Sequence, residues 1–388
     1  MAVSGGSDSL ALLYLMNSWT QKNDRKLYCV TVNHGLRPEA LDEALYVREH
    51  CNKLSIYHEI LTWEHPDISE GKLENAAREA RYKLISDFCG KHGIKIIATG
   101  HNWNDQIETY EMRKAFGSHE SGLAGMSQVK TLNSHLKLIR PLLSFSKKAS
   151  QNFLKQNNIN WKTDPMNFQE HFRRVTARNQ INSYDNDKLN QVSEIILNYG
   201  RIRHQTESAA VKFLRSYCDI SDFGYCCIDF NIFLEQTERV QIEVLKRLIW
   251  NIGGKQYMPS IDENMLEKVL SRQINTIGRC FIKIKKNRLF VFRENRNIEK
   301  VTHASEAPWI WDNRFKIDIK LADNQFIASA EGIYEDIVPK PAVTGFPCLF
   351  ENHMVKYQLE EWVKLLHYIV RPDFFDVYCG VSHEQQEL

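Results

Sequence analysis

The sequence has no long apolar segment, no paired cysteines and almost no net charge. None of its apolar runs approaches the roughly 18 residues that a membrane-spanning helix requires, and its first residues lack the charged-then-apolar order of a secretion signal. We therefore expect a cytoplasmic protein with no membrane partner. The 50 Lys and Arg residues nearly balance the 48 Asp and Glu residues, which leaves a formal charge of +2. A role with nucleic acid would then depend on where the charges lie.

The nine cysteines form no C-x-x-C pair and have no spacing typical of a metal site. We predict reduced thiols and no structural metal. The sequence also contains no internal repeat and no low-complexity tract. Its 388 residues are enough for about two or three domains, and 43% hydrophobic with 25% charged residues is typical of globular proteins with buried cores.

The first part of the chain alternates strand-like apolar runs with helical apolar spacing. This alternation is typical of βαβ units, in which helices cover both faces of a parallel sheet. We predict strands at Leu27–Val32, Tyr57–Leu61 and Ile94–Thr99, and helices at Ala40–Ser55 and Leu73–His92.

A Gly-Ser loop lies between a short apolar run at the N-terminus and an apolar helix. The loop is Ser4-Gly5-Gly6-Ser7-Asp8-Ser9. Its glycines let the backbone approach a phosphate, and the helix after it directs N–H groups at an anion. The serines add hydroxyl donors, and Asp8 could hold Mg²⁺ against the phosphates. The alternative is a linker capped into a helix, but the position between strand and helix favours nucleotide binding. No G-x-x-x-x-G-K-[ST] string occurs, which disfavours ordinary γ-phosphoryl transfer.

A second polar segment follows the predicted strand that ends at Thr99. His101, Asp105 and Glu108 are spaced for one helical face, with Arg113 beside them. Such groups could hold magnesium, accept a proton and fix an amino acid. A solvated charged helix face is the alternative.

Several strings resemble those of one family in the same order. The loop resembles that of the N-type ATP pyrophosphatases (PP-loop proteins), and the whole set resembles the bacterial tRNA(Ile)-lysidine synthase family. The strings beside the loop are Val32–Glu39, Glu74–Tyr82, Ala98–Arg113, Ser121–Met126, Leu138–Leu143 and Asp164–Asn167, with weaker ones at Asn275–Cys280 and Phe290–Glu294.

The resemblance implies an ATP-dependent ligase that adenylates C2 of the wobble cytidine in an isoleucine tRNA with a CAU anticodon. The ε-amine of L-lysine then displaces AMP and forms lysidine. ATP is the co-substrate, Mg²⁺ the cofactor, Asp8 and Asp105 the residues needed for adenylation, and the face around Glu108 the lysine site. A related tRNA thiolation enzyme and a non-catalytic tRNA-binding remnant are the alternatives, the second because Asn33, Asn104 and Thr176 depart from common family choices.

Basic residues give two candidate RNA surfaces. Arg173, Arg174 and Arg178 lie within one and a half helical turns, which suits phosphate contacts. A solvated basic face is the alternative reading. The other candidate is a predicted hairpin that carries Lys283, Lys285, Lys286, Arg288 and Arg293.

We predict an α/β fold in which a parallel-sheet nucleotide-binding domain is followed by a helical region and a small β-rich C-terminal region. The predicted domains are a PP-loop ATP pyrophosphatase domain at 1–185, a mostly helical domain with a hairpin at 186–300, and the β-rich region at 301–388. Only three residues precede the loop, so we also expect the natural chain to begin upstream of Met1. The oligomeric state stays open, a homodimer included.

Overall fold

A computed structural model describes residues 1–35, 39–64, 70–133, 136–162, 172–255, 258–330, 333, 340–343, 345–357, 359–370, 374 and 376. The chain divides into two compact units, Met1–His204 and Gln205–Val377. The division between His204 and Gln205 falls inside helix α8 (Asn186–Tyr217), whereas the sequence predicted domain boundaries near 185 and 300. No break occurs near 300 because Phe292 shares a buried core with Trp311 and Phe315.

The sheet of the first unit is assembled around the Met1–Val3 segment. The N–H of Val3 donates to the Val30 carbonyl (2.9 Å), and the N–H of Ala2 donates to the Ala98 carbonyl (3.0 Å). The segment thereby joins a two-stranded part, β2 (Tyr57–Thr62) and β1 (Tyr28–Asn33), to a three-stranded part. That part has the order β3 (Ile96–Ala98), β5 (Lys137–Ile139) and β4 (Val129–Thr131).

Most of these strands are parallel, as the sequence predicted. Strand β1 pairs in parallel with β2, Ala2 bridges in parallel to Val30, and β3 pairs in parallel with β5. Strand β4 is antiparallel to β5. The predicted α/β class is therefore confirmed, with one antiparallel strand added beside β5.

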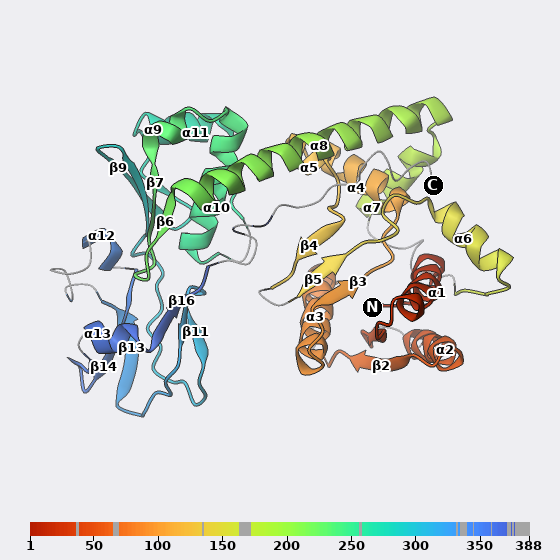
Figure 1. The fold of residues 1–388 in the computed structure, drawn as a ribbon, viewed down its shortest axis with the longest axis horizontal. Coiled ribbons are helices and arrows are strands. Elements are labelled where there is room, and N and C mark those ends of the chain that lie inside the picture. Colours follow the sequence, from red (N-terminus) through yellow and green to blue (C-terminus); the bar gives the residue numbers. More distant parts are fainter. Residues whose placement is uncertain are drawn as a thin grey trace. The chain divides into compact units, whose positions relative to one another are not determined.

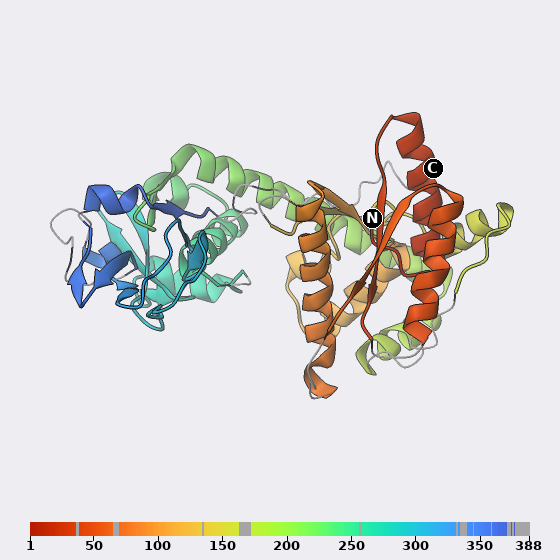
Figure 2. The same ribbon diagram turned by 90° about the horizontal axis from the view of Figure 1, so that it is seen from below.

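Helices cover the two faces of this sheet (Figures 1 and 2). On one face, Leu10 and Leu13 of α1 pack with Val47 of α2 and Leu154 of α6. On the other face, Phe88 of α3 packs in a separate core with strand residues. The helices are α1 (Ser7–Lys22), α2 (Glu39–Lys53), α3 (Glu70–Lys91) and α6 (Lys147–Gln156).

Helix α4 (Trp103–Ala115) packs on the α8 helix through Ile107 and Tyr110, which meet Val192 and Ile196. The remaining helices of the unit are α5 (Glu120–Leu123) and α7 (Phe172–Asn182). In the part of the chain that the structure describes, no helix is long and apolar enough to cross a membrane.

The second unit contains a five-stranded sheet and two three-stranded sheets. The predicted hairpin is confirmed, since β9 and β10 pair antiparallel from Arg288↔Lys285 to Arg293↔Cys280. The strands are β6 (Cys218–Ile220), β7 (Cys226–Asp229), β8 (Thr276–Ile277), β9 (Cys280–Lys285), β10 (Arg288–Arg293), β11 (Trp309–Trp311), β12 (Phe315–Ile317), β13 (Gln325–Ser329), β14 (Pro347–Glu351), β15 (Met354–Val355) and β16 (Leu366–Tyr368). The helices are α9 (Phe230–Leu234), α10 (Glu238–Gly253), α11 (Glu263–Leu270), α12 (Lys340–Val343) and α13 (Leu359–Val363).

A buried carboxylate between two buried arginines holds part of the second unit together. Arg293 donates to both oxygens of Asp312 (Nε to Oδ2, 3.0 Å; Nη2 to Oδ1, 3.1 Å), and Arg314 Nε donates to Oδ2 at 2.8 Å. Both arginine side chains are 0% exposed and that of Asp312 is 6% exposed. Arg293, which the sequence offered as an RNA contact, is therefore enclosed and cannot reach RNA.

We expect Asp312→Asn to lower the free energy of unfolding by about 3–5 kcal/mol, because it leaves two buried guanidinium groups without their counter-charge. Chemical denaturation of the full chain measures this. The matched control is Asp318→Asn, which removes an exposed carboxylate paired with Lys316 and should cost less than about 1 kcal/mol. Equal effects of the two substitutions would contradict the assignment.

Candidate active site

The phosphate loop leaves the sheet at Val3 and enters α1 without a side-chain cap. Gly5 has a φ of +85°, in the left-handed region that favours glycine. Gly6 is the N-cap of α1 and makes no side-chain cap bond, so no N-cap side chain occupies the N–H groups of the first turn. The N–H groups of that turn are thus available to an anion. The predicted strand–loop–helix arrangement is present.

The serine hydroxyls of the loop differ in their surroundings. Ser9 Oγ accepts from the N–H of Ser4 (3.2 Å) and donates to the Gly6 carbonyl (3.0 Å), so it stabilises the loop from within. Ser7 Oγ donates to Asp8 Oδ2 at 3.5 Å. Ser4 is exposed, whereas Ser7 and Ser9 are buried. Of the three predicted hydroxyl donors, Ser9 therefore acts chiefly on the loop itself.

Asp8 has a carboxylate oxygen suited to a cation. Its Oδ1 is fully enclosed and has no hydrogen-bond partner in the part of the chain that the structure describes. Carboxylate oxygens are the ligands that Mg²⁺ prefers, so the residues present fit a magnesium ion here. In the described ranges no group of three or more His, Cys, Asp or Glu side chains could hold a metal, at this loop or elsewhere, so Asp8 would supply a single protein ligand.

Gly100 brings the end of β3 against the start of α1. A Cβ at this position would lie 2.9 Å from the Asp8 carbonyl carbon and 3.0 Å from the Ser9 nitrogen. Only glycine allows this approach. Strands β1 and β2 lie on one side of the Met1–Val3 segment, and β3, β5 and β4 lie on the other. The strand order therefore reverses at this segment, and open α/β sheets bind ligands at such a point.

The second motif begins α4 with a reciprocal pair of hydrogen bonds. Asp105 Oδ2 accepts from the N–H of Asn102 (2.9 Å), and Asn102 Oδ1 accepts from the N–H of Asp105 (3.1 Å). Asp105 thus also supports the helix start. His101 precedes the helix, so it is not on the helical face where the sequence placed it. Its Nδ1 lies 2.9 Å from Thr99 Oγ1.

Two residues that depart from common family choices hold local structure. Asn33 Oδ1 accepts from the N–H of Gly35 (2.9 Å) in the turn after β1. Asn104 Oδ1 accepts from the N–H of Lys147 (2.9 Å) at the start of α6. Neither contact requires a carboxylate.

Glu108 and Arg178 form an ion pair, although the sequence assigned them to different ligands. Arg178 Nε donates to Glu108 Oε1 at 2.8 Å, and the side chains are 29% and 16% exposed. A turn away, the Tyr184 hydroxyl donates to Glu111 Oε1 (2.9 Å). Burial and this carboxylate raise the pKa of Tyr184 to about 12. These contacts connect α4 to the α7 region.

Arg113 contacts the Ser121–Met126 string. Its Nη1 donates to the carbonyls of Gly122 (2.6 Å) and Gly125 (3.1 Å), and burial lowers its pKa. The sequence did not single out Gln106. Its Nε2 donates to the Met126 carbonyl (2.9 Å), and its Oε1 accepts from the Met126 N–H (2.6 Å). In the sequence, the resemblance of Ser121–Met126 to a family string was the indication that this segment matters.

Sequence reasoning also missed Lys162, which the fold places beside the loop. Its N–H donates to the Gly5 carbonyl at 3.0 Å. The Tyr46 hydroxyl donates to the Asn160 carbonyl (2.7 Å), so the same segment is also attached to α2. No local pattern indicated either contact.

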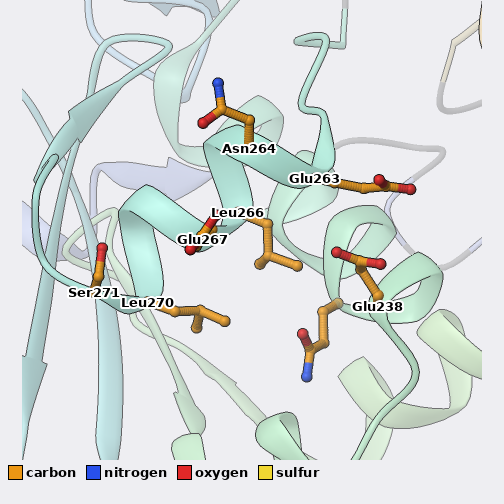
Figure 3. A pocket seen from close by; sticks show the side chains of 8 residues that line it. Glu238, Glu263, Asn264, Leu266, Glu267, Leu270 and Ser271 are labelled. Atoms are coloured by element: carbon orange, nitrogen blue, oxygen red, sulfur yellow. The ribbon is translucent and has the colours of Figure 1, made fainter.

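The remaining predicted residues lie elsewhere. The side chains of Arg173 and Arg174 and the string Asp164–Asn167 lie outside the described residues. Arg288 pairs with Asp219. In the hairpin, the exposed basic residues are Lys283, Lys285, Lys286 and Arg288. A pocket of about 680 Å³ lies between α10 and α11, with Glu238, Glu263 and Glu267 in its lining (Figure 3), and contains none of the predicted site residues.

Comparisons with known proteins agree with this geometry. The family described as the PP-loop domain matches residues 1–184. A tRNA(Ile)-lysidine synthase of Wolbachia pipientis wMel is 31% identical over 332 residues, covering 82% of this chain and 76% of the relative. This chain belongs to the tRNA(Ile)-lysidine synthase family. The protein of that name from Brucella suis biovar 1 (strain 1330) is 33% identical over 328 residues, covering 81% of this chain and 72% of the relative.

Among solved structures, the U34-tRNA thiolase NcsA from Methanococcus maripaludis matches with a TM-score of 0.46 and 18% identity, covering 52% of this chain and 71% of that chain. This likeness is too weak to carry an argument.

We expect Gly100→Ala to lower the affinity for inorganic pyrophosphate about tenfold, because the added methyl group displaces the first turn of α1 and one phosphate hydrogen bond is lost. Isothermal titration calorimetry measures the affinity. Gly90→Ala is the matched control, since a Cβ there would meet nothing within 4 Å. Unchanged binding by the Gly100 variant would show that the contact does not shape the loop.

Proposed function

We propose that this chain ligates L-lysine to C2 of the wobble cytidine in an isoleucine tRNA with a CAU anticodon. ATP adenylates the cytidine and releases pyrophosphate, and the lysine ε-amine then displaces AMP. The proposal is supported by the relatives' name and carried by one observation. The phosphate loop, with Gly100 packed against its helix, lies at the switch point of the sheet.

The loop is suited to holding the departing pyrophosphate. The first turn of α1 offers N–H groups, and Ser4 and Ser7 offer hydroxyls. Asp8 would hold Mg²⁺ through its enclosed Oδ1. When bound, the ion would neutralise charge that develops on the leaving group. Donors fixed in advance stabilise such charge without reorganisation.

The face around Glu108 is suited to an amine. Glu108 lies on the same helix as Asp105, whose carboxylate supports the helix start through one oxygen. We assign Glu108 to the lysine ammonium, His101 and Asp105 to the reacting end of the site, and Arg113 to the Ser121–Met126 segment that it already contacts. Arg178 forms an ion pair with Glu108, so the positive charge of Arg178 acts on the same carboxylate that we assign to the lysine ammonium.

Contacts to the tRNA are assigned to Arg173 and Arg174, and we place the reaction in the cytoplasm. Thiolation of tRNA, the competing chemistry, requires a reactive thiol. Of the described cysteines, Cys218 is half-buried and the other seven are buried. Burial raises the pKa of Cys280 to about 12 and that of Cys89 above its usual range, which disfavours the thiolate at these two residues. The hydrogen bond with Cys29 lowers the pKa of Cys51, but that side chain is buried.

Mass spectrometry of the tRNA decides between the functions. The protein is incubated with isoleucine tRNA (CAU), ATP, Mg²⁺ and lysine, and the wobble nucleoside is analysed. Lysidine formation that needs both ATP and lysine supports the proposal. A sulfur-containing product would support thiolation, and tRNA binding without any product would support the non-catalytic alternative.

We expect Asp8→Asn and Asp105→Asn each to lower lysine-dependent pyrophosphate release by about 10²–10³-fold, because each removes charge from the reacting centre. Affinity for tRNA should change little. Asparagine at 105 keeps an oxygen for the Asn102 N–H, so the helix start is preserved. Asp87→Asn, an exposed residue of α3, is the control. Near-wild-type turnover by both variants would remove these carboxylates from the mechanism.

The ion pair between Arg178 and Glu108 leads us to expect different effects from substituting Arg178 and Arg174. Arg178→Ala should lower the KM for lysine, because the guanidinium no longer competes with the lysine ammonium for Glu108, and should leave the salt dependence of tRNA binding unchanged. Arg174→Ala should reduce the log–log salt slope by about one unit if it contacts one phosphate. A reduced slope in the Arg178 variant with an unchanged KM would instead make Arg178 the phosphate contact.

A further inference from the structure

The phosphate loop carries no cation of its own. Its six residues are Ser4–Ser9, and the only charged one among them is Asp8. A polyphosphate is highly anionic, and loops that bind it commonly add a lysine to their N–H donors. A cation from outside the loop would therefore complete the set of donors.

The fold brings Lys162 to this position. Its N–H donates to the Gly5 carbonyl at 3.0 Å, which attaches the backbone of residue 162 to the loop. Its Nζ lies 5.1 Å from the centre of the Tyr46 ring, a cation–π contact. That ring lies against the loop as well, since a Cβ on Gly5 would be 3.9 Å from Tyr46 Cδ1. The backbone of residue 162 is thus attached to Gly5, and its ammonium lies over a ring that also borders Gly5.

The surroundings of Lys162 leave its charge available. The side chain is exposed, and no carboxylate in the described part of the chain forms an ion pair with it. The aromatic ring positions the ammonium without neutralising it, because a cation–π contact supplies no negative charge. By contrast, Lys155 lies on α6, is exposed, and has no described contact with the loop.

We infer that the Lys162 ammonium is a phosphate-binding group of this site, which holds the polyphosphate of the nucleotide together with the loop. This inference rests on the proposed use of ATP. Lys162 binds the β,γ-phosphate portion and the pyrophosphate released from it, and Tyr46 is its positioning residue. The ligand class is a linear polyphosphate, with or without a nucleoside.

The test separates the ammonium from the backbone bond. Lys162→Ala removes the charge but keeps the N–H that donates to Gly5. Affinity for tripolyphosphate and for α,β-methylene-ATP, measured by calorimetry on the full chain, should fall about tenfold in this variant, the value of one charged hydrogen bond. Its binding should also depend less on salt. Lys162→Arg should restore most of the affinity, and Lys155→Ala should bind as the wild type does.

Two further measurements keep the outcomes distinct. Tyr46→Phe removes the hydroxyl bond to Asn160 but keeps the ring, whereas Tyr46→Leu removes both. Relative to Tyr46→Phe, Tyr46→Leu should weaken tripolyphosphate binding by less than Lys162→Ala does, and adding Tyr46→Leu to a Tyr46-intact Lys162→Ala chain should cost no more than Tyr46→Phe costs there. Thermal melting confirms that each variant folds. Equal binding by wild type and Lys162→Ala would overturn the inference alone, whereas a wild-type chain that binds neither ligand would contradict the proposed function as well.

Discussion

The hydrogen bonds made by Met1–Val3 are the constraint on which the first unit depends. They join β1 and β2 to the three-stranded part of the sheet. The same segment leads directly into the phosphate loop, so the bonds that complete the sheet also fix where the loop begins. Gly100 then approaches the first turn of α1 from the neighbouring strand. The same contacts therefore complete the sheet and position the site.

Local sequence patterns were sufficient for the elements but not for their partners. The strands near Leu27 and Ile94 and the helix after the loop were predictable because their apolar spacing reflects burial. The β9–β10 hairpin was predictable because apolar residues alternate with polar ones along its strands. Asp105 was read as a catalytic group, and the pattern could not reveal its second role. An Asn followed three residues later by an acidic residue is typical of a helix start. The same acidic residue can also take part in a reaction, so the pattern does not separate the two roles.

Charge was the property that the sequence conveyed least well. Arg178 and Arg293 both stand in basic stretches, yet one pairs with Glu108 and the other is enclosed with Asp312. Their partners are distant in the sequence, and no local pattern indicates them. Lys162 is the opposite case, because it is an isolated lysine that tertiary packing places beside Gly5. The domain limits also depended on tertiary packing, since the two units divide inside the continuous helix α8, which begins after residue 185, and a shared core spans the region near residue 300.

The burial of the thiols has a practical consequence. Because seven of the eight described cysteines are shielded from solvent, a thiol reagent can reach them only when the surrounding core opens. Cys29 and Cys51 lie in the core beneath the phosphate loop, and Cys226 and Cys280 lie in the main core of the second unit. The rate at which each pair is alkylated thus reports how often its own unit opens. The chain carries a built-in probe of local stability in each unit.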